Sequence, residues 1–587
     1  MLAVGLIFFL AIVTSLISGI LALMFLMRLV LPDADEKEGL LTRFAVPDIL
    51  LAGIVVLTVY AQIVSLFGGV RVRGWLCLAP VWAVMMLFGL RQKGGAAWKR
   101  FLTERFGRKY LKTHPWELLT GGAIFLVYAY GTSHGLEHYD TGLYHAQAIK
   151  WIAEIGMMRG LGNLHTRLAY NSSAFALSAL FDLNGTHAMA GFMALLLAWK
   201  CMGLRGLFRR RRMEMPDAPR LLAVYYLFMI YDEMVSPAPD YFVNCVLLYL
   251  VIAWLDAMED DADEHSYALL CVLAVYAVTL KLSVAPLLLL TVYAVWRIKK
   301  LQPILIYLLA GCVVIAPFLI RNVFLSGYLI YPFPAIDLFN VEWKIPQGVA
   351  MYDAREIAVY GRGYMDVLRY DEPMWVWIAD WEGNLGFLDR MFYHMNQVMI
   401  PILLLLIIIF FIQMVRLRVR LEWSERHAAG FSLFMLLLVL YLFWFLSAPL
   451  VRYGKMILWL PGTLFYGFVI VTRQDKPLHR MKTKHRFLYA ALLLFFLYKS
   501  AMLIGDDLPR ADVRWLTEQQ PYAAFALEQY DVIETPAGQK TPLYAPTEGD
   551  RVGSELLASP NRVHMQAIGD WSQGPGPRAG LRAVEEQ

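Results

Sequence analysis

Long apolar runs separated by short charged segments dominate this chain. Most of the runs extend over about 17 to 25 residues, which is the length that an α-helix needs to cross the hydrocarbon core of a bilayer. The pattern therefore predicts an all-α polytopic membrane protein. We expect about fourteen transmembrane helices, at residues 3–30, 48–68, 75–90, 117–133, 186–203, 220–236, 241–257, 266–281, 283–297, 302–320, 397–415, 429–447, 454–471 and 487–503.

Lysine and arginine gather in five of the segments that join these runs. With alternating helices all five fall on one side of the membrane, and the positive-inside rule makes that side cytoplasmic. The five segments are Arg91 to Lys112, Lys200 to Arg220, Arg297 to Lys300, Arg416 to Arg426 and Arg473 to Arg486. We therefore expect a multi-pass protein of the cytoplasmic (inner) membrane, with both termini on the outer face.

Two polar segments suggest how the chain is divided. The first, 321–396, has mixed charge and many aromatic residues, and we expect a small outer-face soluble domain there. The second, 504–587, is rich in Gly and Pro and predicts a partly ordered outer-face tail. The remaining parts are N-terminal transmembrane helices at 1–115, a transmembrane core at 116–320 with an outer-face loop at 134–185, and C-terminal transmembrane helices at 397–503.

Composition agrees with the apolar pattern and excludes some functions. The chain is 59% hydrophobic and 17% charged, whereas soluble domains have about 45–50% apolar and about 25% charged residues. The net charge of +5 lies mostly in short connections, so it indicates topology and not a nucleic-acid surface. Neither a Walker A motif nor a dinucleotide-binding glycine motif is present, which disfavours ATP-driven transport and a nucleotide-sugar donor.

Ionisable side chains crowd the loop 134–185, although almost everything around it is apolar. Its candidate site residues are Glu137, His138, Asp140, His145, His165 and Arg167. Asp140 precedes the amphipathic segment YHAQAIKWIAEIG, which we expect to lie in the membrane interface with Trp151 at the level of the headgroups. Asp140 is either the N-cap of that helix or a proton-accepting carboxylate, and the two readings are compatible.

Further charged residues mark the outer ends of predicted helices. Asp240 in SPAPDYF is either a cap at a proline-broken turn or a second carboxylate of a site. Each basic residue is either an interfacial anchor or a contact for a phosphate group, and these residues are Lys281, Arg321, Arg452 and Lys455. His138 and His145 flank Asp140, so a divalent metal stays open as an alternative to a site with no certain cofactor.

Several of these segments carry a resemblance to a known class of enzyme. They are DTGLYHAQAIKWIAEIG, GLGNLHTRLAYNSS, PAPDYF, KLSVAP, RNVFLSGYLIYPFP followed by NVEWKIP, and APLVRYGK. Together they resemble a group of uncharacterised bacterial polytopic proteins of surface-polysaccharide loci, which are similar in layout to GT-C-type membrane glycosyltransferases. The resemblance extends over roughly residues 115 to 470.

The resemblance implies a GT-C-like glycosyltransferase that acts on the outer face in surface polysaccharide or glycan assembly. Its partners would be membrane lipids, a polyprenyl-phosphate-linked sugar donor, and a glycan or lipid acceptor. Asp140 would be the catalytic base with Glu137 or Asp240 in support, and Lys281, Arg321 and Arg452 would hold the phosphate. The tryptophans of MWVWIADWEGN would stack on sugar rings or form the core of the small domain, and we favour the core.

Two rival functions stay open. A polysaccharide polymerase or ligase would join lipid-linked repeat units at the same outer face, with the same cationic clamp. A lipid-linked oligosaccharide flippase would instead need charged residues deep within helices that line a cavity. The centres of the predicted helices are nearly free of charge, which favours an enzyme.

Overall fold

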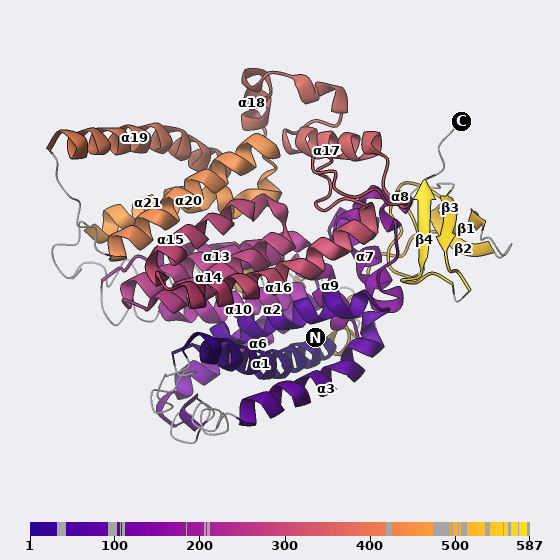
Figure 1. Cartoon of the computed structure of the whole chain (residues 1–587), viewed down its shortest axis with the longest axis horizontal. Helices are drawn as coiled ribbons and strands as arrows, with labels where there is room; N and C mark the ends of the chain where they lie inside the picture. The colour runs from indigo at the N-terminus through magenta and orange to yellow at the C-terminus, as the bar shows by residue number, and fades with distance from the viewer. Residues whose placement is uncertain are drawn as a thin grey trace.

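The computed structural model describes residues 1–31, 43–91, 103–105, 107, 112–183, 185–204, 207, 212–417, 425–472, 494, 497–499, 501–502, 504–505, 514–534, 540–555, 557–560, 565–572 and 574–583. The described chain is mostly helical, and its helices lie side by side in one large bundle (Figure 1). The longer helices of the bundle are α1 (Leu2–Val30), α2 (Val46–Ser65), α3 (Val70–Arg91), α6 (Pro115–Ser133), α10 (Met189–Cys201), α12 (Asp217–Met229), α13 (Pro239–Glu259), α14 (Glu264–Leu280), α16 (Leu301–Ser326), α19 (Phe387–Leu417), α20 (Glu425–Ser447) and α21 (Val451–Thr472).

Shorter elements fill the connections. Between α6 and α10 lie η2 (Thr141–His145), α7 (Ala146–Lys150), η3 (Trp151–Ile155), α8 (Leu161–Leu164), η4 (Thr166–Ala169) and α9 (Ser173–Leu180). Later in the chain come η5 (Met202–Leu204), η6 (Leu282–Leu289), α15 (Leu290–Ile298), α17 (Gln347–Gly361), η7 (Val367–Asp371), α18 (Met374–Gly383) and α23 (Arg514–Thr517).

Six of the described helices are long and apolar enough to cross a membrane, namely α1, α2, α13, α16, α20 and α21. They match runs that the sequence predicts as spans, and they support a multi-pass membrane protein. The total of fourteen spans stays a prediction, and the run 487–503 lies largely outside the described residues. The same is true of much of the basic connections, including 92–102, 208–211, 418–424 and 473–493, so the orientation in the membrane also stays a prediction.

Helices α1 and α2 pack at very close range through two glycines. A Cβ atom on Gly19 would lie 2.0 Å from the carbonyl oxygen of Ile49, and one on Gly53 would lie 1.8 Å from that of Ser15. Small residues allow membrane helices to approach in this way, because no side chain holds the two backbones apart. The N-terminal run is therefore an integral part of the bundle.

Several segments that are far apart in sequence meet at one end of the bundle. The amino group of Met1 donates to the carbonyl of Glu518, and Ser65 at the end of α2 bonds to Arg321 near the end of α16. Arg452 at the start of α21 reaches Asp140 in the loop after α6. We call this the site end. The loops 134–185, 321–396 and 448–453 and the tail, which the basic segments predict on one face, have their described residues at this end of the bundle.

The tail forms a small sheet against the site end, at the right of Figure 1. The strands are β1 (Leu527–Glu534), β2 (Lys540–Pro546), β3 (Met565–Gly569) and β4 (Ala579–Ala583), in the order β2-β1-β3-β4. Leu527 lies opposite Pro546 and Met565 opposite Ala583 in antiparallel pairs, whereas β1 and β3 run parallel. The described chain is therefore mostly helical and not all-α, because its tail contains a sheet that the composition did not predict.

Two expectations for tryptophans need correction. Trp151 is buried in the core, so its side chain does not face lipid headgroups as the amphipathic pattern predicts. Trp377 and Trp381 are buried as expected, but they pack against Phe445 and Trp444 of α20 and belong to the core of the main bundle. A separate soluble domain at 321–396 stays a prediction.

Candidate functional site

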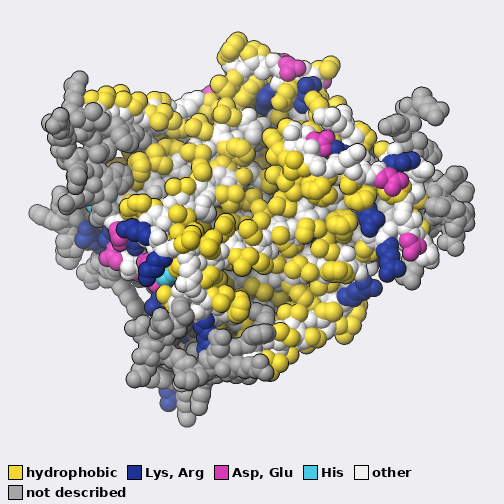
Figure 2. Space-filling model, viewed as in Figure 1, with side chains coloured by type: hydrophobic (Ala, Val, Ile, Leu, Met, Phe, Trp, Pro, Cys, Tyr) yellow, Lys and Arg dark blue, Asp and Glu magenta, His cyan; other side chains and the backbone are white. Residues whose placement is uncertain are grey.

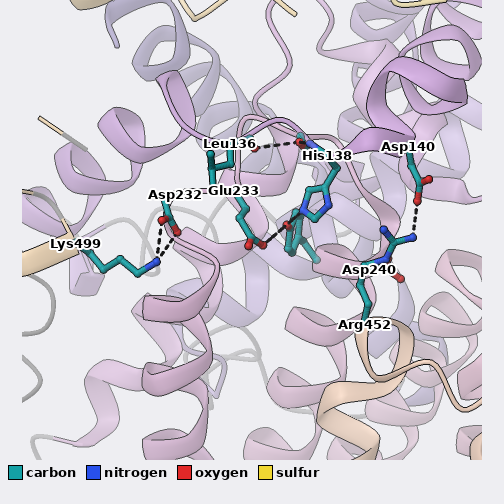
Figure 3. A network of polar contacts seen from close by, with 10 residues as sticks. Leu136, His138, Asp140, Asp232, Glu233, Asp240, Arg452 and Lys499 are labelled. Carbon is teal, nitrogen blue, oxygen red and sulfur yellow. Dashed lines mark hydrogen bonds and ion pairs between the residues drawn. The ribbon is translucent and has the colours of Figure 1, made fainter. Parts of the chain in front are cut away.

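Four charged residues from four separate parts of the chain converge at the site end, namely Asp140, Asp240, Lys281 and Arg452. Figure 3 shows Asp140, Asp240 and Arg452 of this group. Asp140 immediately precedes η2, and Asp240 lies in the first turn of α13, which begins with Pro239 at a position that suits proline. Lys281 interrupts the helical run between α14 and η6, because its backbone is extended (φ −157°, ψ 129°). Arg452 lies in the first turn of α21.

The two basic residues neutralise the two carboxylates. Arg452 Nη2 lies 2.5 Å from Asp140 Oδ2, and its Nε lies 3.7 Å from Asp240 Oδ2. Lys281 donates to the other oxygen of Asp240 and lies 3.5 Å from the centre of the Tyr453 ring, a favourable position for a cation. Asp140 makes no side-chain hydrogen bond to the start of η2, so its reading as an N-cap is wrong.

A cavity of about 360 Å³ opens beside these ion pairs. Its polar lining consists of His138, Glu233, Asp240, Tyr241, Asn244, Arg452 and Lys455. Among the described residues, no carboxylate lies within ion-pairing distance of Lys455, whose ammonium group faces the Trp459 ring at 5.6 Å. Lys455 is therefore available to an anionic ligand. The rest of the lining is largely apolar, with Tyr226, Met229, Ile230, Ala238 and Val451.

A hydrogen-bonded group at this cavity was not expected from the sequence. The Tyr241 hydroxyl donates to Glu233 at 2.6 Å and is also hydrogen-bonded to His138 Nε2. Burial alone would raise the pKa of Glu233, but its hydrogen bonds with His138 and Tyr241 outweigh burial and hold this pKa below its usual range. Glu233 therefore stays ionised. Glu233 falls inside the apolar run 220–236, and the residues around it do not indicate that it belongs to a site.

His145 and Glu137 lie near the cluster but in different surroundings. His145 is buried among aromatic rings, with Tyr144 at 4.4 Å and Phe175 at 5.5 Å, and burial lowers its pKa to about 3. It is therefore neutral at ordinary pH. Glu137 accepts a hydrogen bond from the backbone N–H of Ala523 in the tail at 2.8 Å, and burial raises its pKa. Because of this contact, the Glu137 carboxylate points toward the tail and does not join the ion pairs of Asp140 and Asp240.

Three other candidates belong to separate contacts. The buried Arg321 guanidinium donates to Asn171 Oδ1 at 2.8 Å and to Ser65 Oγ. Arg167 pairs with Glu356 at 3.1 Å, and His165 Nδ1 accepts from the backbone N–H of Arg167. Arg321 therefore does not join the cation pair of Arg452 and Lys281, because α16 holds it beside α2 and the segment before α9.

The histidines do not assemble a metal site with these carboxylates. In the part of the chain that the structure describes, no three His, Cys, Asp or Glu side chains are grouped so that they could hold a metal ion. His138 binds Tyr241, and His145 is enclosed by aromatic rings. The arrangement offers ion-pair and hydrogen-bond chemistry toward a ligand with an anionic group.

The segment that carries Asp140 is also held by the tail. Val552 and Gly553 donate their backbone N–H groups to the carbonyl of Gly142, at 2.8 and 2.9 Å. The buried Gln147 side chain donates to the carbonyl of Gly553 and accepts from the N–H of Ala558. These contacts fix η2 and α7, and with them the position of Asp140.

Comparisons with known proteins add a family but no described activity. Neither the curated proteins nor the solved structures contain a match to this chain. A family match covers residues 1–459, which include Asp140, Asp240, Lys281, Arg452 and Lys455 but not the sheet of the tail. The chain belongs to the family described as a domain of unknown function, DUF8201.

Proposed function

We propose that this protein is an integral membrane glycosyltransferase that takes a sugar from a polyprenyl-phosphate-linked donor at the outer face of the cytoplasmic membrane. The observation that supports the proposal best is the cavity lined by Arg452, the ion-pair partner of Asp140, in which Lys455 is a cation with no carboxylate partner among the described residues. An unpaired cation at the edge of a bilayer is costly unless it serves a ligand. A lipid-linked phosphate has an anionic group that could bind Lys455 and an apolar chain that could lie in the bilayer.

The charges of the cavity support a phosphate more than a neutral ligand. Asp140 and Asp240 pair with Arg452 and Lys281, and the ionised Glu233 is hydrogen-bonded to Tyr241. The carboxylates and cations of the site are therefore equal in number, but Lys455 is in ion-pair contact with no carboxylate among the described residues. Arg452 can bind a phosphate through two parallel N–H donors, and Lys455 adds a point charge. Stabilisation of a departing phosphate by fixed cations is a major contribution to this kind of catalysis.

In the proposed reaction an acceptor hydroxyl oxygen attacks the anomeric carbon of the donor sugar. The bond between that carbon and the phosphate oxygen breaks, and its electron pair stays on the phosphate, beside Lys455 and Arg452. The proton of the hydroxyl passes to the carboxylate of Asp140, which acts as the general base. Arg452 ties donor binding to this base, because a phosphate that competes for the guanidinium weakens the ion pair that holds Asp140.

The test measures binding of a long-chain polyprenyl phosphate to the full-length protein in lipid nanodiscs. Lys455→Met removes the charge and keeps most of the side-chain volume. Its affinity should fall about 10- to 100-fold, since a hydrogen bond to a charged group contributes about 1.5–3 kcal/mol. Lys455→Arg should restore part of the affinity.

Lys499→Met is the matched control. Lys499 pairs with Asp232 at 2.8 Å at the same end of the bundle, and it does not line the cavity (Figure 3). Its loss should leave the affinity unchanged. Equal affinities for the wild type and for Lys455→Met would exclude the phosphate site. The length of the product then separates transfer of one sugar from joining of repeat units by a polymerase or ligase.

A further inference from the structure

The segment from Tyr364 to Phe387 exposes an unusual set of large apolar side chains. The exposed fractions are 84% for Met365, 88% for Leu368, 80% for Trp375 and 83% for Phe387. The segment contains η7 and α18 and leads into α19, and Figure 1 shows α18 beside the ends of α20 and α21. Figure 2 shows hydrophobic side chains over this part of the surface. An apolar patch of this kind would promote aggregation in water unless a partner or a membrane covers it.

The opposite face of α18 is firmly attached to the bundle. Trp377 and Trp381 are buried, and Trp381 Nε1 donates to the carbonyl of Pro449 at 2.7 Å. Pro449 lies in the turn between α20 and α21, three residues before Arg452. The segment is therefore amphipathic, with one face packed on the turn that precedes Arg452 and the other face directed away from the protein.

Exposed apolar side chains also occur on α19 and α20. Val398 of α19 is 62% exposed and Leu446 of α20 is 61% exposed, and α20 is one of the helices that can cross a membrane. Side chains on such helices face lipid, so the patch on η7 and α18 extends a lipid-facing surface. Polar groups flank it, since Arg369 pairs with Glu372 and lies 3.4 Å from the Tyr364 ring centre.

We propose that Tyr364 to Phe387 is a membrane-docking segment whose Met365, Leu368, Trp375 and Phe387 side chains insert into the lipid leaflet beside α19 and α20. Apolar side chains at the acyl boundary with charged neighbours at headgroup level are typical of interfacial elements, and tryptophan prefers that level. The buried face with Trp377 and Trp381 links this docking to the turn that carries Arg452. The inference does not depend on the proposed transferase activity.

Spin labels at single cysteines test the insertion in the full-length chain. The exposed Cys77 and Cys312 are first replaced by Ser, while the buried cysteines are kept. Labels at Leu368→Cys and Trp375→Cys are measured in nanodiscs of phosphatidylethanolamine and phosphatidylglycerol. Because oxygen concentrates in lipid, both labels should be several-fold more accessible to oxygen, relative to a water-soluble nickel complex, than a label at Glu548→Cys. Glu548 is an exposed residue of the tail and serves as the aqueous reference.

Two results would overturn the proposal. Labels at Leu368 and Trp375 with the same preference for the nickel complex as the Glu548 label would place the segment in water. Spin–spin broadening that disappears on dilution with unlabelled protein would show that a second copy of the chain covers the patch. Since all three positions are on the surface, loss of folding does not complicate the comparison.

Discussion

The two ends of α13 carry two clusters of charged residues that differ in how completely they are paired. Asp240 and Asp256 lie 16 residues apart, which is about 24 Å along an α-helix. At the Asp256 end, Lys200 lies 3.1 Å from Asp48 and 3.3 Å from Asp256, and Arg220 contacts Asp217 and Asp256. Each of these two cations has two carboxylate partners. At the Asp240 end, Lys455 has none among the described residues.

The difference shows why cavity size alone does not identify the site. The larger cavity, of about 1030 Å³, lies at the Lys200 end. Its lining includes six carboxylates, of Asp48, Glu214, Asp256, Glu259, Asp260 and Asp263, against four cations, of Arg43, Arg105, Lys200 and Arg220. An excess of negative charge repels a phosphate. The smaller cavity at the site end is better suited to an anion, because its Lys455 is not already neutralised.

Replacement of Asp140 should give the largest effect. Asp140→Asn keeps the size of the side chain but cannot accept a proton at neutral pH, so the rate of sugar transfer should fall by about 10²–10⁴. Stability should change little, since the carboxylate does not cap η2 and its ion pair with Arg452 is partly exposed.

Asp232→Asn is the control for this substitution. Asp232 forms a similar ion pair with Lys499 at the same end, and both of its side-chain oxygens lie within 3.0 Å of Lys499 Nζ. Unlike Asp140, whose partner Arg452 lines the cavity, Asp232 pairs with Lys499 outside it, so this variant should transfer sugar at the normal rate. A normal rate for Asp140→Asn as well would remove Asp140 from the mechanism and leave Glu233 and Asp240 as candidates for the base.

The Lys200 cluster should affect stability instead of activity. Lys200→Met leaves Asp48 and Asp256 without their shared cation, and the loss of hydrogen bonds between these half-buried charged groups should cost about 1.5–3 kcal/mol in free energy of unfolding. Lys455→Met should cost far less, because no carboxylate among the described residues depends on Lys455. Denaturant unfolding of both variants in micelles measures the contrast, and equal losses would contradict it.

The free energy of unfolding at the site end should also depend more strongly on acidic pH than that at the Lys200 end. Burial lowers the pKa of His165 to about 4, from an ordinary value of 6.5, so the folded state favours neutral His165. This stabilisation is complete above pH 6.5 and is lost as the pH falls from about 6.5 to about 4, because the unfolded chain then binds the extra proton. His165→Gln should flatten the fall in unfolding free energy over that range. An unchanged pH profile would show that His165 titrates normally.

Much of the bundle could be predicted from the sequence, because hydrophobic length is a local property. The run 241–257 corresponds to Pro239–Glu259, and the run 454–471 to Val451–Thr472. The two short runs on either side of residue 282 are separate helices, since Lys281 breaks the helical path. These features depend on neighbouring residues alone.

The pairings within the site could not be predicted in the same way. Asp140 and Arg452 are 312 residues apart, and they meet only because α13 and α21 pack side by side at the loop after α6. The sequence also predicts Arg321 in this site, because Arg321, like Arg452, lies at a helix end on the predicted outer face. The direction in which each side chain points depends on helix rotation, and periodicity does not determine it across such distances.

A smaller effect should appear where the tail holds the site end. The buried Gln147 amide donates to Gly553 at 3.0 Å and accepts from Ala558 at 3.2 Å. Gln147→Met keeps the volume but leaves two backbone groups of the tail unpaired, at a cost of about 1–3 kcal/mol for each that stays buried. Hydrogen exchange at Ala558 should therefore become faster, whereas exchange around Lys200 should stay the same. Faster exchange at both ends would mean that Gln147 supports the whole bundle, and that the ends of α13 are not held independently.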